Sequence, residues 1–388
     1  MKRALMLASV ASMIDQFNMN NIAILQDLGY RVDVATNLEF GSSTSQERVY
    51  KFKQELLQQK INPFHIPFPR QITNIKNMFS AYKIVRKLIN QNQYEIIHCH
   101  SPIGGVIARL ASMSARRKGT RVLYTAHGFH FFHGAPKQNW LIFYPIEKIC
   151  ARFTDCLITI NTEDFLQATS KKFPAKRIMY VPGVGINSEG IKQVFIDKSK
   201  KKAEFGIKDE CVLLSVGELN DNKNHEVIIN ALVQIDRPIK YILCGKGEKL
   251  DYLKNLTKEL NIEDKVIFTG FRTDISEIMH ICDIFCFPSY REGLSVALME
   301  AMASGLPIVC SEIRGNVDLV KDQKGGYLLN PDDVNAFGKR IEKLVNDKEL
   351  RISMGQFNMD YIKEYDFKIV NKNMESIYKE CIQENGAN

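Results

Sequence analysis

The sequence of 388 residues predicts an α/β fold with two doubly wound parallel-sheet domains. Short apolar runs typical of buried parallel strands alternate with helix-forming segments along the chain. The length also exceeds one usual core, since domains average about 150 residues. The alternation restarts at residue 211. We therefore expect a Rossmann-like domain over 1–185, a second over 186–364, and a last helix over 365–388.

In the first domain, strand 4–10, helix 16–28 and strand 30–35 form an opening βαβ unit. Gly29 caps its helix, and 11–15 is expected to be a loop. The further elements expected here are helix 84–90 with its neighbours, strand 96–100, helix 104–115 and strand 121–125.

The amino-terminal segment also imitates a short signal peptide, because Met1-Lys-Arg precedes an apolar run over 4–11. That run is at the lower limit of length for a signal peptide. Nine cysteines without a Cys-x-x-Cys pair argue against export and suit small core residues in a reducing cytosol. We therefore expect a first strand and, without an apolar stretch near 18 residues, no membrane span.

The second domain repeats the alternation. The expected strands are 211–216, 240–244, 284–287 and 307–311, and the expected helices are 224–234, 248–259, 295–303, 334–345, 348–364 and 367–384. The turn at Gly245-Lys-Gly247 lacks the third glycine of a dinucleotide fingerprint, so we interpret it as a tight βα turn.

The stretch 287–305 is the most informative, because it is expected to form a strand end, a loop and a helix start. Loops at this edge of a parallel sheet bind ligands. The amides of Gly293, Leu294 and Ser295 are donors at a helix N-terminus and suit a phosphate or a sugar hydroxyl. Glu292 and Glu300 lie about two turns apart, near one face. The alternative is a helix-start acid favoured by the dipole and a solvated surface acid.

Net charge is distributed unevenly. Residues 1–180 carry 24 Lys and Arg against 11 Asp and Glu, whereas the rest carries 28 against 33. A basic first half suggests an anionic surface, either phospholipid headgroups or nucleic acid. No zinc spacing, helix-turn-helix or RNP-like motif is present, so we expect no nucleic-acid partner.

A second turn, 216–225, follows the first strand of the second domain. Gly217 permits close approach of a ligand, and Lys223 suits a diphosphate as a point charge. The alternative is that Lys223 is an ordinary solvated lysine in a polar loop.

Segment 288–309 resembles, nearly position for position, the Glu-x7-Glu signature of retaining glycosyltransferases of family 4. Segments 97–102, 124–131 and 180–186 also look like that family. The resemblance implies the GT-B fold, two Rossmann-like domains facing a central cleft, of the kind acting in bacterial capsule or exopolysaccharide assembly. It implies that the first domain binds the acceptor, that the second binds the nucleotide sugar, and that the last helix, 365–388, returns to the first domain. It also implies transfer of a hexose or N-acetylhexosamine from a nucleoside diphosphate sugar, expected to be a UDP-sugar, with retention. The sequence has no aspartate pair of the Asp-x-Asp kind that would hold a metal. We therefore expect the leaving-group charge to be met by protein groups, without a metal ion or cofactor.

The resemblance also implies roles for individual residues. Glu292 would hold the donor sugar hydroxyls, Glu300 the ribose hydroxyls, Lys223 the diphosphate, and His127 the sugar near its reacting carbon. Segment 269–272, which ends at Arg272, resembles the part whose backbone contacts the base, although Arg272 itself suits the surface equally well. On the acceptor side we place Ser12 and His100.

One position departs from the family pattern. Glu218 stands where the family usually has an arginine that pairs with the lysine on the diphosphate. A carboxylate cannot neutralise phosphate, so either another cation substitutes or Glu218 turns away. Arg314, in the turn after strand 307–311, is our candidate for the substitute cation.

The family commonly uses lipid-linked acceptors, so we expect a polyprenyl-diphosphate-linked saccharide as acceptor. Aromatic and basic residues mix over 64–89 and 129–143, and loop aromatics around Pro136 are hard to bury all at once. We expect a cytoplasmic protein attached peripherally to the anionic inner face of the plasma membrane. The alternative is that the apolar residues of these segments form core-facing stripes of helices and the basic residues form a solvated face. Two rival functions stay open: a nucleotide-sugar epimerase on this fold, and a non-catalytic UDP-binding partner of another transferase.

Overall fold

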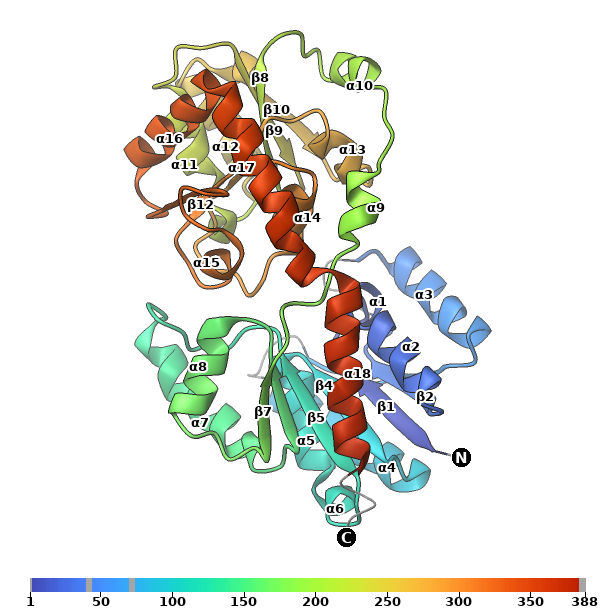
Figure 1. The fold of residues 1–388 in the computed structure, drawn as a ribbon. Coiled ribbons are helices and arrows are strands. Elements are labelled where there is room, and N and C mark those ends of the chain that lie inside the picture. Colours follow the sequence, from blue (N-terminus) through green and yellow to red (C-terminus); the bar gives the residue numbers. More distant parts are fainter. Residues whose placement is uncertain (1, 40–43, 70–73, 384–388) are drawn as a thin grey trace. The chain divides into compact units, whose positions relative to one another are not determined.

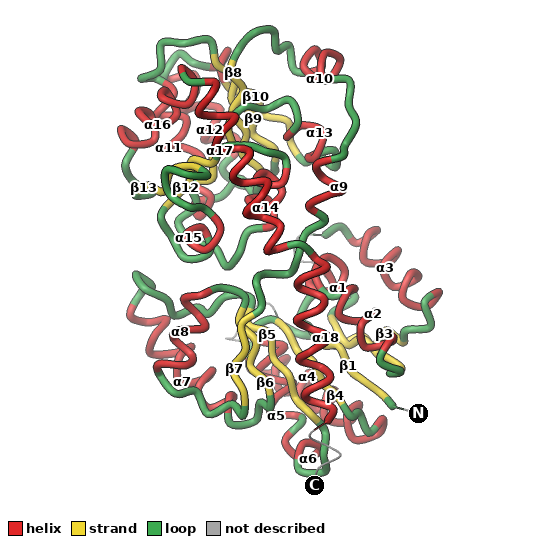
Figure 2. Tube along the Cα trace, viewed as in Figure 1, coloured by secondary structure: helices red, strands yellow, loops and turns green. Residues whose placement is uncertain are grey.

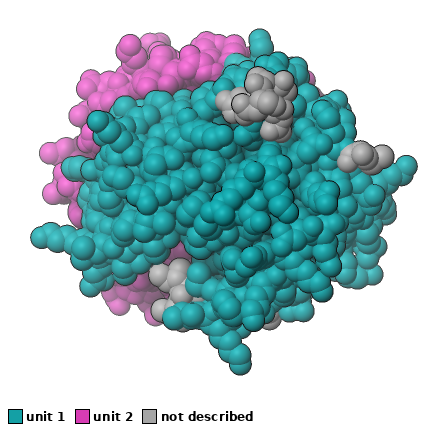
Figure 3. Space-filling model, turned by 90° about the horizontal axis from the view of Figure 1, so that it is seen from below, with its two compact units in different colours: residues 1–185, 368–388 teal, residues 186–367 magenta. Residues whose placement is uncertain are grey.

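The computed structural model describes residues 2–39, 44–69 and 74–383. The chain divides into two compact units, coloured separately in Figure 3. The first unit holds residues 1–185 together with 368–388, and the second holds residues 186–367. Residues from the carboxyl end of the chain are therefore part of the first unit.

Seven parallel strands form the sheet of the first unit in the order β3-β2-β1-β4-β5-β6-β7 (Figure 1). Their bounds are β1 Arg3–Leu7, β2 Arg31–Thr36, β3 Asn62–His65, β4 Ile96–His100, β5 Arg121–Ala126, β6 Cys156–Thr159 and β7 Arg177–Tyr180. In β1 and β4, Ala4 pairs with Ile96 and Leu7 with Cys99. The order of strands reverses between β1 and β4, which is the switch point where doubly wound sheets bind ligands.

Helices cover both faces of this sheet (Figure 2). One face packs against α1 Ala11–Phe17, α2 Met19–Asp27, α3 Gln46–Gln58 and α18 Phe367–Gln383, and the other against α4 Ile75–Asn92, α5 Pro102–Ala111, α7 Lys137–Ala151 and α8 Thr162–Ser170. The short α6 Met113–Arg116 follows α5. Helix α18 packs here because Val370, Met374, Ile377 and Tyr378 recur at helical spacing and are buried.

Two expectations for this unit are wrong. Residues 11–15 are not a loop, because α1 begins at Ala11, where Ala11 and Ile14 are buried in the core. The aromatics around Pro136 are not left exposed either. Phe129 and Phe131 are buried, and Trp140 and Phe143 pack against the same core. Contact with the rest of the unit, which local sequence does not reveal, accounts for both errors.

Six parallel strands form the second sheet in the order β10-β9-β8-β11-β12-β13. Their bounds are β8 Cys211–Val216, β9 Ile239–Cys244, β10 Val266–Gly270, β11 Ile284–Phe287, β12 Ile308–Ser311 and β13 Gly326–Leu329. Its switch point lies between β8 and β11, where Ile284 pairs with Leu213. The predicted doubly wound parallel fold is thereby confirmed in both units.

Helices again cover both faces of the sheet. One face packs against α9 Ser188–Lys192, α13 Ile275–Met279, α14 Val296–Ala303 and the 3₁₀ turn η3 Ile362–Tyr365, and the other against α11 His225–Leu232, α12 Leu250–Glu259, α16 Val334–Asn346 and α17 Lys348–Tyr361. The remaining elements are α10 Lys198–Glu204, α15 Asn316–Leu319 and the 3₁₀ turns η1 Asp221–Lys223 and η2 Glu263–Lys265.

The nine cysteines are all free thiols, and seven are buried and two half-buried. The prediction that they are small core residues is confirmed.

Candidate glycosyl-transfer site

The loops after β8 and β11 meet at the switch point of the second sheet. Asn222 joins them twice: its carbonyl accepts a hydrogen bond from the amide of Tyr290 (2.8 Å), and its side-chain amide donates to the carbonyl of Arg291 (3.0 Å). The side chain of Asn220 caps the η1 turn by accepting from the amide of Lys223. These bonds hold Lys223 and Glu292 on facing loops.

Lys223 and Glu292 form an ion pair, with 2.7 Å between Nζ and Oε1. The lysine side chain is 19% exposed and the glutamate side chain 15%. The ammonium also lies over the ring of Phe287, 4.7 Å from its centroid. Gly217 makes room for the lysine stem, because a Cβ there would lie 3.1 Å from Lys223 Cε. The structure thus brings together a cation and a carboxylate that stand 69 positions apart in the sequence.

The N-terminus of α14 lies directly after Glu292. Ser295 caps the helix by accepting from the amide of Leu298 (3.3 Å). Within the described ranges, the amides of Gly293, Leu294 and Ser295 donate no hydrogen bond to the protein. Three donors at the positive end of a helix are therefore open to an anion or a hydroxyl.

Glu300 lies on α14 and is half-buried. Burial raises the pKa of its carboxyl group above the usual 4.5. Its carboxylate forms no hydrogen bond or ion pair with any residue that the structure describes. A partly desolvated acid without a partner suits a ligand that donates hydrogen bonds.

Arg314 lies in the turn after β12 and contacts the Glu292 loop. Its Nε donates to the main-chain carbonyl of Glu292 (3.2 Å), and the residue is only 8% exposed. Gly315 has a φ of 82°, and a Cβ there would lie 2.0 Å from the carbonyl oxygen of Gly293. The close approach of these two loops therefore requires a glycine.

Glu218 is exposed, and its carboxylate accepts a hydrogen bond from the side chain of Asn220 (3.1 Å).

Arg272 forms ion pairs with two acids, with 2.6 Å from its Nη2 atom both to Asp274 and to Glu204. The Arg272 guanidinium in turn lowers the pKa of the Asp274 carboxyl. The charge of Arg272 is therefore already neutralised by these two acids.

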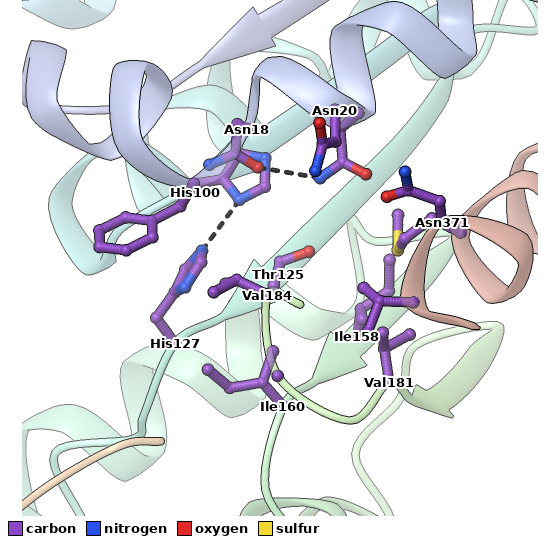
Figure 4. Close-up of a pocket in the computed structure, with 15 residues that line it drawn as sticks. Asn18, Asn20, His100, Thr125, His127, Ile158, Ile160, Val181, Val184 and Asn371 are labelled. Carbon is purple, nitrogen blue, oxygen red and sulfur yellow. Dashed lines mark hydrogen bonds between the residues drawn. The ribbon is translucent and has the colours of Figure 1, made fainter. Parts of the chain in front are cut away.

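In the first unit, three histidines lie in a row: His98 in the middle of β4, His100 at its carboxyl end, and His127 directly after β5. His98 contacts the hydroxyls of Tyr378 (2.6 Å) and Thr125 (2.8 Å). His100 Nδ1 lies 3.1 Å from His127 Nε2. His100 and His127 also line a pocket of this unit with asparagines and apolar residues from α1, α2, β6 and α18 (Figure 4).

Burial keeps the row neutral. It lowers the pKa of His98 to about 3 and that of His127 to about 4, and it lowers the pKa of His100 well below 6.5. Ser12, the other residue predicted on the acceptor side, is buried in α1 and does not line this pocket.

Sequence reasoning missed three of these features: the tie through Asn222, the Tyr378–His98 bond across 280 positions, and the row formed by the histidines. No local signal marks them. In the part of the chain described, no group of three or more His, Cys, Asp or Glu side chains is arranged to hold a metal ion.

Comparison with known proteins identifies the family. A family model described as glycosyl transferases group 1 matches residues 197–359, and one described as glycosyltransferase family 4 matches residues 21–184. The chain is 35% identical to the provisionally named glycosyltransferase EpsD of Bacillus subtilis (strain 168), over 92% of this chain and 90% of that protein.

An Escherichia coli protein named UDP-Gal:alpha-D-GlcNAc-diphosphoundecaprenol alpha-1,3-galactosyltransferase is 30% identical over 77% of this chain and 78% of its own length. Among solved structures, Anabaena Alr3699/HepE in complex with UDP and glucose matches the fold with a TM-score of 0.78 and 20% identity, over 97% of this chain and 99% of that one. The chain therefore belongs to the glycosyltransferases of family 4, which have the GT-B fold of two Rossmann-like domains.

Proposed function

We propose that the protein transfers a hexose or N-acetylhexosamine from a UDP-sugar to a hydroxyl of a polyprenyl-diphosphate-linked saccharide, with retention, in cell-surface polysaccharide synthesis. One observation carries the proposal: the Lys223–Glu292 pair at the switch point, beside the open amides of 293–295. A cation, a carboxylate and a helix N-terminus together suit a ligand with both phosphates and hydroxyls.

In this proposal, Lys223 turns from Glu292 to the diphosphate or bridges the two, because an ammonium has three hydrogens to donate. Glu292 accepts hydrogen bonds from the donor sugar, and Glu300 accepts them from the ribose. His127 of the first unit contacts the transferred sugar. Ser12 and His100 belong to the acceptor side, where the buried His100 acts through His127. The base is contacted by the backbone at 269–272, near Arg272.

The chemical step breaks the bond between the sugar C1 and the diphosphate oxygen and forms a bond from C1 to the acceptor oxygen on the same face. The acceptor proton goes to the leaving phosphate oxygen. Lys223, the amides of Gly293, Leu294 and Ser295, and Arg314 stabilise the charge that develops on the diphosphate. We propose that these groups make a metal ion and a cofactor unnecessary.

The names of relatives support the choice of donor and acceptor. The similar Escherichia coli protein is named for transfer from UDP-Gal to a diphosphoundecaprenol-linked GlcNAc. A Campylobacter jejuni protein, 32% identical over 192 residues, is named for transfer of N-acetylgalactosamine to a diphospho-undecaprenol-linked saccharide.

Two helices of the first unit carry the proposed membrane surface. On α4, Ile75 and Phe79 are exposed together with Lys83, Arg86 and Lys87. Helix α7 exposes four aliphatic side chains, Leu141, Ile142, Ile146 and Ile149. Both helices pack against α5, so they belong to one layer. No helix that the structure describes is long and apolar enough to cross a bilayer.

We propose that this layer attaches the protein peripherally to the anionic cytoplasmic face of the membrane, since each basic residue near such a surface contributes about 1 kcal/mol. The protein should sediment with anionic vesicles at low salt, less at high salt, and little with neutral vesicles. Changing Lys83, Arg86 and Lys87 to glutamate should release it.

The matched control changes Lys254, Lys258 and Lys339 to glutamate, three exposed lysines of the second unit. Equal vesicle binding by both triple variants would show that the surface lies elsewhere.

A donor screen tests the function and separates its rivals. UDP release should depend on both a UDP-sugar and a membrane extract that supplies acceptor, and Glu292→Ala should abolish it. Conversion of the UDP-sugar without acceptor would identify an epimerase. UDP binding without turnover across a broad acceptor panel would identify a non-catalytic partner.

A further inference from the structure

A methionine and two histidines form a chain of contacts in the interior of the first unit. His100 Nε2 lies 3.1 Å from the sulfur of Met6, and His100 Nδ1 lies 3.1 Å from His127 Nε2. Met6 and His100 are fully buried, on β1 and β4, whereas His127 is half-buried after β5. Figure 4 shows the two imidazoles with the bond between them.

The protons in this chain can be placed. A thioether sulfur carries no hydrogen and only accepts, so His100 Nε2 must carry its ring proton. A neutral imidazole has one ring N–H, which leaves His100 Nδ1 as an acceptor. His127 Nε2 then donates to it, and His127 Nδ1 keeps a lone pair. The reverse assignment would turn the lone pair of His100 Nε2 toward the lone pairs of the sulfur.

Both rings are neutral, because burial lowers the pKa of His127 to about 4 and that of His100 well below 6.5. Neither ring forms a hydrogen bond or ion pair with a carboxylate among the residues described. Each ring therefore carries a single proton, as the assignment of the protons requires.

We infer that Met6 and His100 are positioning residues that fix His127 as the Nε2–H tautomer, with Nδ1 as a hydrogen-bond acceptor. The functional consequence rests on the proposed role of His127 at the transferred sugar. Nδ1 accepts a hydrogen bond from a ligand hydroxyl and donates none, so His127 orients a hydroxyl-bearing sugar rather than protonating it.

His98 differs from His100 and His127, because its contacts do not determine its tautomer. Its ring lies 4.2 Å from that of His100, yet its two nitrogens contact the hydroxyls of Tyr378 and Thr125. A hydroxyl can donate or accept, so these partners leave either tautomer of His98 possible. The tautomer is determined for His100 and His127, whose chain of contacts ends at the sulfur of Met6.

Nitrogen-15 NMR of the histidine rings tests the assignment on the full chain. Protonated and bare ring nitrogens differ in chemical shift, and the chain has eight histidines, so His127→Gln and His100→Asn identify the two signals. Both should show the proton on Nε2 from pH 6 to 8. A proton on His127 Nδ1 would overturn the inference, whatever the activity. Failure to transfer any sugar with the expected tautomer would instead count against the proposed function.

Two variants of His100 test the consequence. His100→Leu removes the acceptor for His127 Nε2–H, and kcat should fall about tenfold while UDP affinity is kept, since one hydrogen bond is lost. In His100→Asn the Oδ1 atom replaces Nδ1, and kcat should recover to within about threefold. Equal losses in both variants would refute the positioning role.

Met6→Leu tests the first link and conserves volume, so the variant should fold. It should leave His100 a mixture of tautomers in the NMR spectrum, whereas Met354→Leu, an equally buried control in the second unit, should change nothing. An unaltered His100 in Met6→Leu would show that the sulfur does not set the tautomer.

Discussion

Glu300→Ala is expected to weaken UDP binding without destabilising the folded protein. Within the described residues, the Glu300 carboxylate has no hydrogen bond or ion pair to lose, and burial already disfavours its charge, as its raised pKa shows. A structural acid removed from a network would lower stability instead. The combination of weaker binding and unchanged stability therefore identifies a ligand-binding group.

The expected loss follows from two ribose hydroxyls that donate to a partly buried carboxylate. Such bonds contribute about 1–3 kcal/mol, which corresponds to a roughly 5- to 150-fold increase in Kd. Binding should also depend on pH. Hydroxyl donors favour the charged carboxylate, so UDP affinity should fall as the pH drops toward the raised pKa of free Glu300. Glu300→Gln should remove that dependence.

Calorimetric titration with UDP at pH 7.5 measures the affinity, and thermal unfolding without ligand measures stability. Glu342→Ala is the matched control, because Glu342 is an exposed glutamate on α16 of the same unit. Unchanged UDP affinity in a folded Glu300→Ala protein would refute the ribose role. A drop in Tm that corresponds to a loss of unfolding free energy as large as the loss of binding free energy would reassign Glu300 to the fold.

Three further predictions follow from the site. Glu292→Gln should lower turnover at least 10-fold more than UDP affinity, since its proposed partner is the sugar, and parallel losses in kcat and affinity would contradict this. Arg314→Ala should weaken UDP binding much more than uridine binding; equal losses for both ligands in calorimetry would exclude a phosphate contact. Burial lowers the pKa of His98 to about 3 and that of His127 to about 4, against about 6.5 in an unfolded chain. The unfolded state therefore binds more protons between these values, and stability should fall below pH 6.5 by about 1.4 kcal/mol per pH unit for each histidine. Urea unfolding at pH 7 and 5 measures this, and His127→Gln should reduce the slope.

The fold could be predicted because its signals are local. The apolar runs at 96–100, 211–216 and 284–287 coincide with β4, β8 and β11, and the Gly29 cap after α2 has the expected positive φ of 85°. Parallel strands buried on both faces leave continuous apolar runs, which need no knowledge of distant contacts to recognise.

The errors came from contacts distant in sequence. Residues 11–15 lack a helix-start signal and form α1 only because Ala11 and Ile14 are buried. Phe129 and Phe131 look like loop aromatics, but they stack at 4.7 Å in a core to which Tyr144 and Phe173 belong. Tertiary burial overrides local pattern in both places.

The candidate site likewise has a part that local sequence predicts and a part that depends on contacts distant in sequence. Glu292 and the amides of 293–295 belong to one strand, loop and helix, so spacing alone placed them. The pairing of Glu292 with Lys223 depends on β8 and β11 being neighbours, which topology decides. The sulfur of Met6 beside His100 is 94 positions away and follows no motif. The sequence therefore predicts the residue types of the site better than their partners.

Transfer of a labelled sugar tests the central claim most directly. The protein is incubated with UDP-sugars carrying carbon-13 at C1 and a polyprenyl-diphosphate-linked saccharide, and the C1 signal of the product is followed by NMR. We predict a new glycosidic C1 with the configuration of the donor, dependent on acceptor and absent in Glu292→Ala. A product of inverted configuration, or a converted UDP-sugar formed without acceptor, would contradict retaining transfer at the Lys223–Glu292 site.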